Sequence, residues 1–528
     1  TGPSGDGIPI FSLTIDPSDP SIVWAGTQNV RGIYRSDDGG RSWTEKVNGI
    51  EEIDGITFRG FTVDPQDSDV VYAAAELGSW VWAGEEMPGR EFDRTAGVVY
   101  RTEDGGDTWV AIWRGDNLAR YVWIEPGDAD TIYVSTGIFD REAANSEPDG
   151  GVPGGAGVVK STDGGATWLP ANEGLGNLYV GSLSLSPHEP STLLAGTGNN
   201  QYFDGNDAYL TVDGAATWQA LGLHENITAV ELTSDPAIAY AASVDSVYRT
   251  DDGGERWVRV AGTDRGWGPP GVRAGFPIDI QVDPRDPMRV FINNYGGGNF
   301  LSTDGGYHWE AASRGYSGAQ TRDIAVDPQV PSRVYAAARS GLFVSDDGGT
   351  TWKGLAYGNA AALEHHAIAV DPTDSTHLLA ATNWHRTLMS SVEGGRYWPF
   401  VGPDLPENMA WECIVFAPSD PAIVYAGSGA YRSAGGFDPG LPADGVYVSR
   451  DGGRGWEPIN GGAANGAQIA DLAVHPEFVG FVFAASTTNG LLRTYDGGGE
   501  WEAVGGGLPE NATALAVAFD PHQPESVL

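Results

Sequence analysis

The octapeptide Ser345-Asp346-Asp347-Gly348-Gly349-Thr350-Thr351-Trp352 decides the fold of this chain, because close copies of it recur along the whole sequence. Successive copies end on tryptophans that stand 39 to 66 residues apart. The ten closing residues are Trp43, Trp109, Trp168, Trp218, Trp257, Trp309, Trp352, Trp398, Trp456 and Trp501. Self-similarity at such a period is typical of a repeat protein.

The chemistry of the octapeptide predicts a tight turn. An aspartate side chain accepts hydrogen bonds from backbone N–H groups that follow it, and the paired glycines allow the positive φ of a sharp reversal. The acidic position is occupied by Asp38, Asp104, Asp163, Asp213, Asp252, Asp304, Asp347, Glu393, Asp451 and Asp496. Each turn offers one well-placed carboxylate, whereas calcium takes roughly six to eight oxygen ligands. We therefore expect these acids to be structural and predict no metal or cofactor.

Strand-like segments surround every copy of the turn. In the first unit they cover residues 10–16, 21–27, 31–36 and 42–47, bounded by Pro, Gly and Asp. Four short strands per repeat indicate the blade of a β-propeller, and we name them A, B, C and D, so that the octapeptide is the C-to-D turn. The predicted fold is all-β, a single ten-bladed propeller over residues 1–528, with two smaller propellers as the alternative.

A mismatch remains between turns and strands. Eleven A-type segments ending in Asp-Pro or a related pair are present, against ten octapeptides, so that one A strand at about 512–528 is surplus. The surplus strand closes the ring in place of the first one, leads into a further part, or completes a blade of another molecule.

The octapeptide resembles the Asp-box, or BNR, repeat of sialidases, xyloglucanase-type glycoside hydrolases and sortilin-type receptor domains. The resemblance covers nearly the whole chain, and ten copies in one array are most similar to the ten-bladed sortilin-type ring. It implies a propeller but says little about activity, because those families include enzymes, receptors and assembly factors.

The composition predicts an acidic, exported protein. The chain carries 71 acidic and 30 basic residues, a formal charge of −41, which argues against nucleic acid and anionic membranes as partners. The sequence holds a single cysteine, Cys413, which excludes an intrachain disulfide. No apolar run has membrane-spanning length, so we expect no membrane insertion. An extracellular or cell-surface location follows as an expectation.

Candidate binding residues lie on the loops between B and C strands, opposite the face of the repeated turns. The longest of these loops cover residues 76–97, 137–157, 197–208, 293–299 and 428–445. Aromatic side chains beside carboxylates suit a carbohydrate site, since the rings stack on sugars and the acids bind or hydrolyse them. Trp80 and Trp82 are the ligand-binding candidates, and Glu85, Asp93, Asp140 and Asp204 the weak catalytic ones. The alternative is that these loops pack on one another.

A second group of candidates comes from the register of the A strands. Counting back five residues from each Asp-Pro position reaches Arg59, Arg120, Arg322, His366 and Glu412, which we expect at one height along the channel. The three arginines resemble the triad that grips a carboxylate in sialidases. They belong to the second, third and seventh blades, however, so they cannot meet on one small sugar in a ten-bladed ring. Solvated channel-lining residues are the alternative.

Two features bear on catalysis and metal binding. Where xyloglucanase-type enzymes have a catalytic Asp after the first B strand, this chain has Gln28, and an amide cannot act as acid or base. A histidine group in the eighth unit offers possible ligands, namely Glu364, His365, His366 and His385 with Trp384 and Arg386. Because neighbouring strands of one blade often produce such coincidences, no metal site is assigned.

The sequence thus predicts a secreted or cell-surface binding or structural module, with a non-enzymatic role favoured. Its partners would be a second copy joined by strand exchange, an extracellular glycan or a protein. The competing prediction is a glycoside hydrolase acting on an extracellular polysaccharide.

Overall fold

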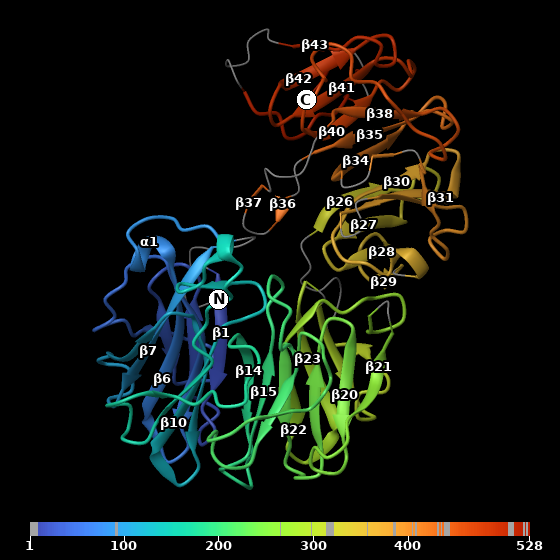
Figure 1. The fold of residues 1–528 in the computed structure, drawn as a ribbon. Helices are drawn as coiled ribbons and strands as arrows, with labels where there is room; N and C mark the ends of the chain where they lie inside the picture. Colours follow the sequence, from blue (N-terminus) through green and yellow to red (C-terminus); the bar gives the residue numbers. More distant parts are fainter. Residues whose placement is uncertain are drawn as a thin grey trace. The chain divides into compact units, whose positions relative to one another are not determined.

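The computed structural model describes most of the chain, and the prediction of an all-β propeller of four-stranded blades is confirmed (Figure 1). The described residues are 9–89, 93–263, 266–296, 298–312, 321–355, 357–383, 387–403, 405–406, 409–429, 432–433, 436–437, 444–504, 512–520, 523 and 526–527. Over these residues the chain forms ten large antiparallel sheets, a number that fits ten blades.

Each sheet runs A-B-C-D in chain order. The A strands are β1(Ile10–Ile15), β5(Ile56–Asp64), β9(Ala119–Glu125), β14(Val180–Leu185), β18(Ala229–Leu232), β22(Phe276–Asp283), β26(Thr321–Val326), β30(His365–Asp371), β34(Trp411–Phe416) and β40(Ile469–Val474). The B strands are β2(Val23–Thr27), β6(Asp67–Gly78), β10(Asp128–Thr136), β15(Leu193–Thr197), β19(Ala239–Ala242), β23(Asp286–Tyr295), β27(Val334–Ala338), β31(Asp374–Thr382), β35(Val424–Ser428) and β41(Val482–Ser486).

The outer half of most sheets is shorter, with the sheet of β18 to β21 as the exception. The C strands are β3(Ile33–Ser36), β7(Arg94–Thr102), β12(Val158–Ser161), β16(Ala208–Thr211), β20(Ser246–Thr250), β24(Gly298–Ser302), β28(Gly341–Ser345), β32(Thr387–Ser391), β38(Val446–Ser449) and β42(Gly490–Thr494). The D strands are β4(Thr44–Glu45), β8(Val110–Gly115), β13(Leu169–Pro170), β17(Gln219–Ala220), β21(Val258–Gly262), β25(Glu310–Ala311), β29(Lys353–Gly354), β33(Phe400–Val401), β39(Glu457–Pro458) and β43(Glu502–Ala503).

A few short elements lie outside this pattern. The helix α1(Ser79–Trp82) and the 3-10 turns η1(Pro148–Gly150) and η2(Gly358–Ala360) interrupt connections, and β36(Arg432–Ser433) pairs with β37(Gly436–Phe437). The strand β11(Glu142–Ala143) pairs in parallel with β7 of the preceding sheet. The loop of the third blade is thereby joined to the second.

The repeated turn has the hydrogen bonds that its sequence predicts. In the copy between β28 and β29, Thr351 donates its N–H to Asp347 Oδ1 over 2.8 Å and its hydroxyl to Oδ2 over 2.6 Å. Ser345 Oγ accepts the Gly349 N–H at 2.8 Å. Gly348 and Gly349 have φ of 69° and 90°, values that favour glycine. The turn therefore closes on its own residues.

Packing between neighbouring sheets forms the core. In the first two blades Trp24, Phe58 and Val98 belong to one buried cluster, and the Trp109 ring meets the Trp24 ring edge-on at 5.8 Å. The Trp109 indole donates to Lys46 O of the preceding blade at 3.0 Å. A closing tryptophan of the repeat thus also joins blades.

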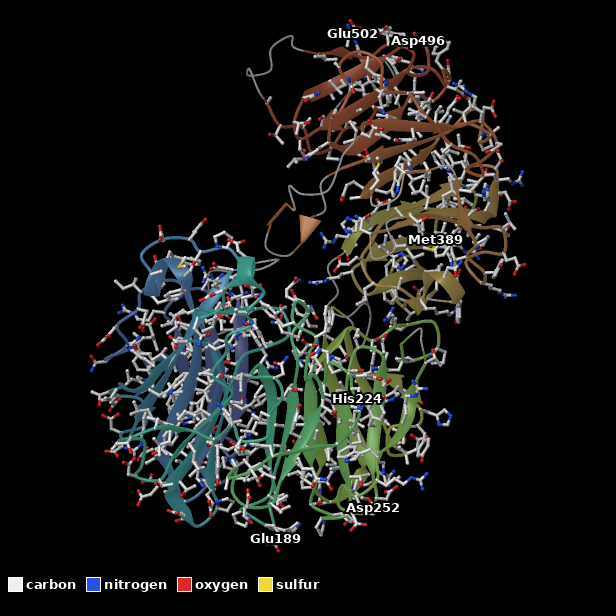
Figure 2. All side chains as sticks on the ribbon, in the orientation of Figure 1. Glu189, His224, Asp252, Met389, Asp496 and Glu502 are labelled. Carbon is white, nitrogen blue, oxygen red and sulfur yellow. The ribbon has the colours of Figure 1, made fainter. Side chains whose placement is uncertain are left out.

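The chain divides into two compact units. Unit 1 comprises residues 1–261, 277–292 and 302–307, and unit 2 comprises 262–276, 293–301 and 308–528. The prediction of one domain over 1–528 stays a prediction. Within unit 1, Glu189 of an A-to-B turn and Asp252 of a C-to-D turn lie at the same end (Figure 2), and α1 lies at the opposite end (Figure 1). The B-to-C loop that contains α1 is therefore on the face away from the repeated turns.

Candidate functional site

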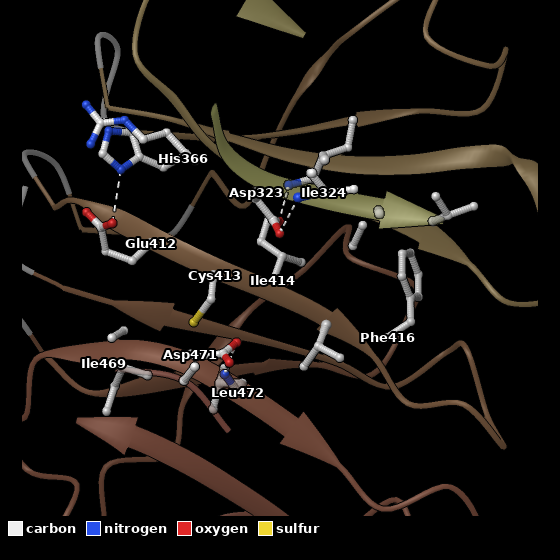
Figure 3. A pocket seen from close by; sticks show the side chains of 18 of the residues that line it. Asp323, Ile324, His366, Glu412, Cys413, Ile414, Phe416, Ile469, Asp471 and Leu472 are labelled. Atoms are coloured by element: carbon white, nitrogen blue, oxygen red, sulfur yellow. Dashed lines mark hydrogen bonds and ion pairs between the residues drawn. The ribbon is translucent and has the colours of Figure 1, made fainter. Parts of the chain in front are cut away.

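A cavity of about 800 Å³ opens among the A strands of unit 2. Its walls come from β26, β30, β34 and β40, together with Leu515 and Ala516 (Figure 3). Arg322, His366 and Glu412, all selected from the sequence, line it. A cavity of this size accommodates a small molecule or a few units of a polymer. Ligand binding by these three residues stays a prediction.

The three residues share a backbone feature, a β-bulge. In β30 the pairing with β31 passes from His365↔Thr382 to Ala367↔Ala381, so that His366 is the extra residue. The same shift in β26 and β34 leaves out Arg322 and Glu412. A bulge re-aims one side chain without ending the strand. The constant five-residue count from the Asp-Pro position therefore marks the bulge.

A buried chain of charges runs along this side of the cavity. His366 Nδ1 lies 3.0 Å from Glu412 Oε2 (Figure 3). Its Nε2 lies 3.8 Å from Glu364 Oε2. Glu364 also pairs with Arg339 and, at 3.4 Å, with Arg322. Its backbone has a φ of 58°, a strained value for a residue with a side chain.

The charges set the protonation of the network. Burial alone would lower the pKa of His366, but the contacts with the carboxylates of Glu364 and Glu412 outweigh it and raise the pKa above its usual value. Burial would raise the pKa of Glu364, yet the contact with His366 and the charges of Arg339 and Arg322 lower it. His366 is thus favoured as an imidazolium between two carboxylates.

Two aspartates that the sequence prediction missed also face the cavity. Asp323 accepts the N–H groups of Ile324 and Ile368 at 2.8 and 3.0 Å. Asp471 accepts those of Leu472 and Val517 at 2.8 and 2.9 Å. Burial raises the pKa of both carboxyls, and these hydrogen bonds offset it only in part. A carboxyl that keeps its proton longer than usual suits a general acid.

Cys413 lies in the same cavity wall, on β34. The thiol is buried, and burial, followed by the charges of Asp471 and Glu412, raises its pKa well above the ordinary value. Cys413 is therefore a poor nucleophile but a well-placed reporter.

In unit 1, the predicted arginines Arg59 and Arg120 form ion pairs or hydrogen bonds with neighbouring residues. Arg59, again a bulge residue, pairs with Glu76, whose other oxygen lies 3.1 Å from Arg141 Nε. Arg120 donates to Ile278 O over 2.7 Å and lies over the Tyr121 ring. The structure thus gives these two arginines internal partners, and any binding of a ligand by them stays a prediction.

The loop residues of the second blade divide into packed and exposed ones. Trp82 packs against the core cluster of the first two blades, whereas Trp80 is 43% exposed. Asp93 accepts the Ser79 hydroxyl at 2.8 Å and the Ser79 N–H at 3.3 Å, which fixes the start of α1. Glu85 is exposed on the following turn.

The remaining sequence candidates do not gather into one site. Asp140 is buried, 3.3 Å from Arg141 Nη1, and Asp204 is exposed. His365 Nε2 contacts Ala360 O at 3.2 Å. Trp384, His385 and Arg386 lie outside the described residues.

A signal for the missed aspartates is present in the sequence. Asp323 and Asp471 each follow the counted position by one residue and stand directly before the apolar residues 324–326 and 472–474 of the same strands. An acid inside an apolar strand is unusual, because burial of a charge is costly without partners. Each has one partner on its own strand and one from another segment, Ile368 for Asp323 and Val517 for Asp471.

Fold and cavity together define an all-β propeller with an acid-lined cavity on its A strands. No protein-family model matches the sequence. The xyloglucanase Xgh74A of Acetivibrio thermocellus is 23% identical over 334 residues, which are 51% of this chain and 38% of that protein. An oligoxyloglucan-reducing end-specific xyloglucanase of Emericella nidulans is 26% identical over 210 residues, 35% of this chain and 24% of that protein.

A solved structure supports the fold. The crystal structure of an ancestral GH74 enzyme superposes with a TM-score of 0.57 at 18% identity, covering 93% of this chain and 70% of that one. The alignment with Xgh74A spans less than half the length of that relative.

These comparisons correct one prediction. The expectation of a binding or assembly module is wrong, because the relatives found are xyloglucanases, and they favour the alternative of a glycoside hydrolase. The propeller part of the resemblance is confirmed by the fold, whereas none of these relatives supports the sortilin-type assignment. In the part of the chain that the structure describes, no helix is long and apolar enough to cross a membrane.

Proposed function

We propose that this chain is part of an exported glycoside hydrolase that cleaves a β-glucan backbone of the xyloglucan type. The observation that carries the proposal is the cavity of unit 2, which is lined by Glu412, paired with His366, and by Asp323 and Asp471, whose pKa values burial raises. Glycoside hydrolysis needs a pair of carboxyl groups, one as acid and one as base. The xyloglucanase relatives support the substrate class.

The residues have distinct roles in this proposal. Asp323 or Asp471, with a raised pKa, donates a proton to the glycosidic oxygen as the bond to the anomeric carbon breaks. Glu412, held by His366 and by Asn383 Nδ2 at 3.3 Å, accepts a proton from the water that attacks this carbon. Gln28 has no part in the proton transfer, since an amide side chain neither donates nor accepts a proton near neutral pH.

Trp80 supplies a glycan contact on unit 1 in the same proposal. Its indole lies against the backbone of Gly55 and Gly78, where an added Cβ would stand 2.7 Å from ring atoms in each case. One side of the ring is therefore seated on glycines, while 43% of the residue is exposed. A fixed, exposed indole offers an apolar surface for a sugar ring.

Reducing-end release from xyloglucan by the full chain tests the function. We expect Glu412→Gln to lower kcat by about 100-fold or more, and the variant of the acid, Asp323→Asn or Asp471→Asn, to do the same. The exposed Glu477→Gln is the matched control and should retain full activity. No hydrolysis of xyloglucan or another β-glucan by the unmodified chain, or full activity of Glu412→Gln, would contradict the proposal.

A further inference from the structure

Neighbouring residues fix the place of the Glu412 carboxylate in the cavity. His366 Nδ1 lies 3.0 Å from Glu412 Oε2, and Asn383 Nδ2 donates to Oε1 over 3.3 Å (Figure 3). The backbone of Gly429 is also close, since an added Cβ there would stand 2.5 Å from Glu412 Cγ. The side chain of Glu412 therefore has little freedom to turn, and its position depends on His366 and Asn383.

Asn383 is itself held by two backbone groups. It directly follows β31, and its Oδ1 accepts the Trp411 N–H over 2.9 Å. Its own N–H donates to the carbonyl oxygen of Glu364 over 2.8 Å. The amide that bonds to Glu412 is thus tied to Glu364 through the backbone.

His366 is linked to the same glutamate through its side chain. Its Nε2 lies 3.8 Å from Glu364 Oε2, on the opposite ring nitrogen from Glu412. The charged groups that act on the imidazole are Glu364 before β30, Glu412 of β34 and Arg322 of β26. Burial and the charge of Arg322 favour the neutral ring, but the two carboxylates outweigh them and raise the pKa of His366 above its usual value.

Glu364 is therefore shared by both groups that hold the Glu412 carboxylate. It is buried, its carboxylate pairs with Arg339, and its N–H donates to Arg339 O over 2.7 Å. Its φ of 58° lies in the left-handed region, where a turn alone would favour glycine. Such a conformation persists only where the surroundings over-determine it, and it often marks a functional position. A glutamate here brings a carboxylate to His366 and a carbonyl oxygen to Asn383 at once.

We propose that Glu364 is a positioning residue for Glu412, which it reaches through the His366 side chain and the Asn383 backbone. The ionised Glu364 keeps the imidazole charged, and the charged imidazole holds the Glu412 carboxylate in one place. Among the described residues that line the cavity, His366 and Glu412 are present and Glu364 is not. The effect of Glu364 on the rate rests on the proposed glycoside hydrolase function, whereas its effect on His366 does not.

Titration of His366 in the full chain measures the first link without any assay of activity. In protein with 13C-labelled histidines, the ring signal that is missing from His366→Gln belongs to His366. We expect its midpoint to lie above the ordinary value of about 6.5 and to fall by about one pH unit or more in Glu364→Gln, because one of the two carboxylates is lost. An unchanged midpoint in Glu364→Gln would overturn the proposal.

Two further variants complete the titration. Glu477→Gln is the matched control, because it removes the same charge at an exposed position of unit 2 and should leave the midpoint unchanged. Glu364→Asn guards against a loss of folding, since asparagine adopts a left-handed backbone more readily than most residues. It also lacks the carboxylate, so its midpoint should fall as in Glu364→Gln. A midpoint equal to that of the unmodified chain in folded Glu364→Asn counts against the proposal.

Xyloglucan hydrolysis tests whether Glu364 acts on Glu412 through His366. We expect Glu364→Gln to lower kcat by about 10-fold with little change in KM, because the proton acceptor is displaced while the residues that touch the substrate remain. The double variant Glu364→Gln/His366→Gln should be no slower than His366→Gln alone. A glutamate that only neutralised Arg322 and Arg339 would act independently of His366. Effects on kcat that multiply in the double variant would therefore overturn the proposal.

Asn383→Asp tests the second link. It keeps the acceptor for the Trp411 N–H but replaces the donor to Glu412 by an oxygen, so kcat should fall by about 10-fold in a folded variant. Full activity of Asn383→Asp would exclude Asn383 from the support of Glu412.

The failure of this proposal and that of the proposed function give different results. If the unmodified chain hydrolyses no glycan but the midpoint falls in Glu364→Gln, the proposed function fails and the link between Glu364 and His366 stands. If the chain hydrolyses xyloglucan but Glu364→Gln changes neither kcat nor the midpoint, the positioning role of Glu364 fails alone.

Discussion

At the scale of the residue, one aspartate carboxylate holds the repeated turn together, as in the copy of Asp347. The hydrogen bonds from Thr351 and Ser345 lower the pKa of Asp347 to about 2. In the eighth copy, no hydrogen bond to the Glu393 carboxylate is seen among the described residues, and Ser391 and the Trp398 indole make the closing bonds. The longer side chain fills the position without the function of aspartate, so the turn tolerates the loss of one acceptor.

Glu231 in unit 1 is a carboxyl with a different environment. Burial, followed by the charge of Asp279, raises its pKa to about 8, although the Ser184 hydroxyl donates to it at 3.0 Å. Asp279 in turn accepts the Tyr121 hydroxyl at 3.3 Å, and burial raises its pKa as well. The charge of Asp279, on the neighbouring A strand, thus makes ionisation of Glu231 less favourable.

Glu231 should make the stability of the protein depend on pH. In the unfolded chain its pKa is near 4.5, so its contribution to stability is fully present below pH 4.5 and is lost as the pH rises to about 8. Glu231→Gln cannot ionise. We expect its melting temperature, relative to the unmodified chain, to rise by about 2 to 5 °C between pH 4.5 and 8 in thermal unfolding. A constant difference over that range would contradict the raised pKa.

At the scale of the element, short elements on the loop face hold single side chains in place. The helix α1 has only four residues, and its start is held by the bonds from Ser79 to Asp93. Gly78 pairs with Gly55 through a backbone bond of 2.9 Å, and Trp80 lies against both. The helix α1 and the two glycines thus fix the position of the Trp80 indole.

Gly78→Ala tests whether the position of the Trp80 indole matters for binding. The added methyl group would overlap the Trp80 ring, so the indole must move while the tryptophan itself remains. We expect a shift in Trp fluorescence and an affinity for xyloglucan oligosaccharides lowered by about 10-fold, close to the effect of Trp80→Ala. Gly84→Ala is the control, because its Cβ would meet no atom within 4 Å, although its φ of 78° adds a backbone strain that Gly78, with a φ of −63°, does not have. Unchanged affinity in both Gly78→Ala and Trp80→Ala would exclude Trp80 as a glycan contact.

The sequence predicts some of these elements well and others poorly, for physical reasons. Turn geometry is local, so Asp347 and the glycines after it suffice to predict the blade. The bulge residues Arg322 and His366 follow from a constant distance to the Asp-Pro position. In contrast, the pKa of Asp471 depends on burial and on Val517, 46 positions later, and no local pattern encodes such a contact.

The charge of the whole molecule has its own consequence. A formal charge of −41 on 528 residues produces self-repulsion in the compact state, which dissolved ions screen. The repeated turns add to it, because their aspartates stay ionised at neutral pH. Stability should therefore depend on ionic strength more than in a protein of balanced charge.

Salt should stabilise the chain. We expect the melting temperature to rise by about 5 °C or more between 0.1 and 1 M NaCl, over which the screening length falls from about 10 to 3 Å. Sorbitol at equal osmolality is the control for non-ionic effects. A melting temperature that falls with NaCl, or that sorbitol raises equally, would show that self-repulsion does not limit the stability of the folded chain.

The bulges in the A strands affect which substitutions the fold can accept. Phe11, Arg59, Gly181, Arg322, His366, Glu412 and Ala470 occupy the same bulge position in seven sheets. The bulge residue is skipped by the pairing, so replacing it alters no ladder bond. Apolar, small, cationic and anionic side chains are all accepted there. A side chain of different chemistry can therefore be introduced at this position one residue at a time, in four of the sheets at the cavity wall, while the blades that carry it stay folded.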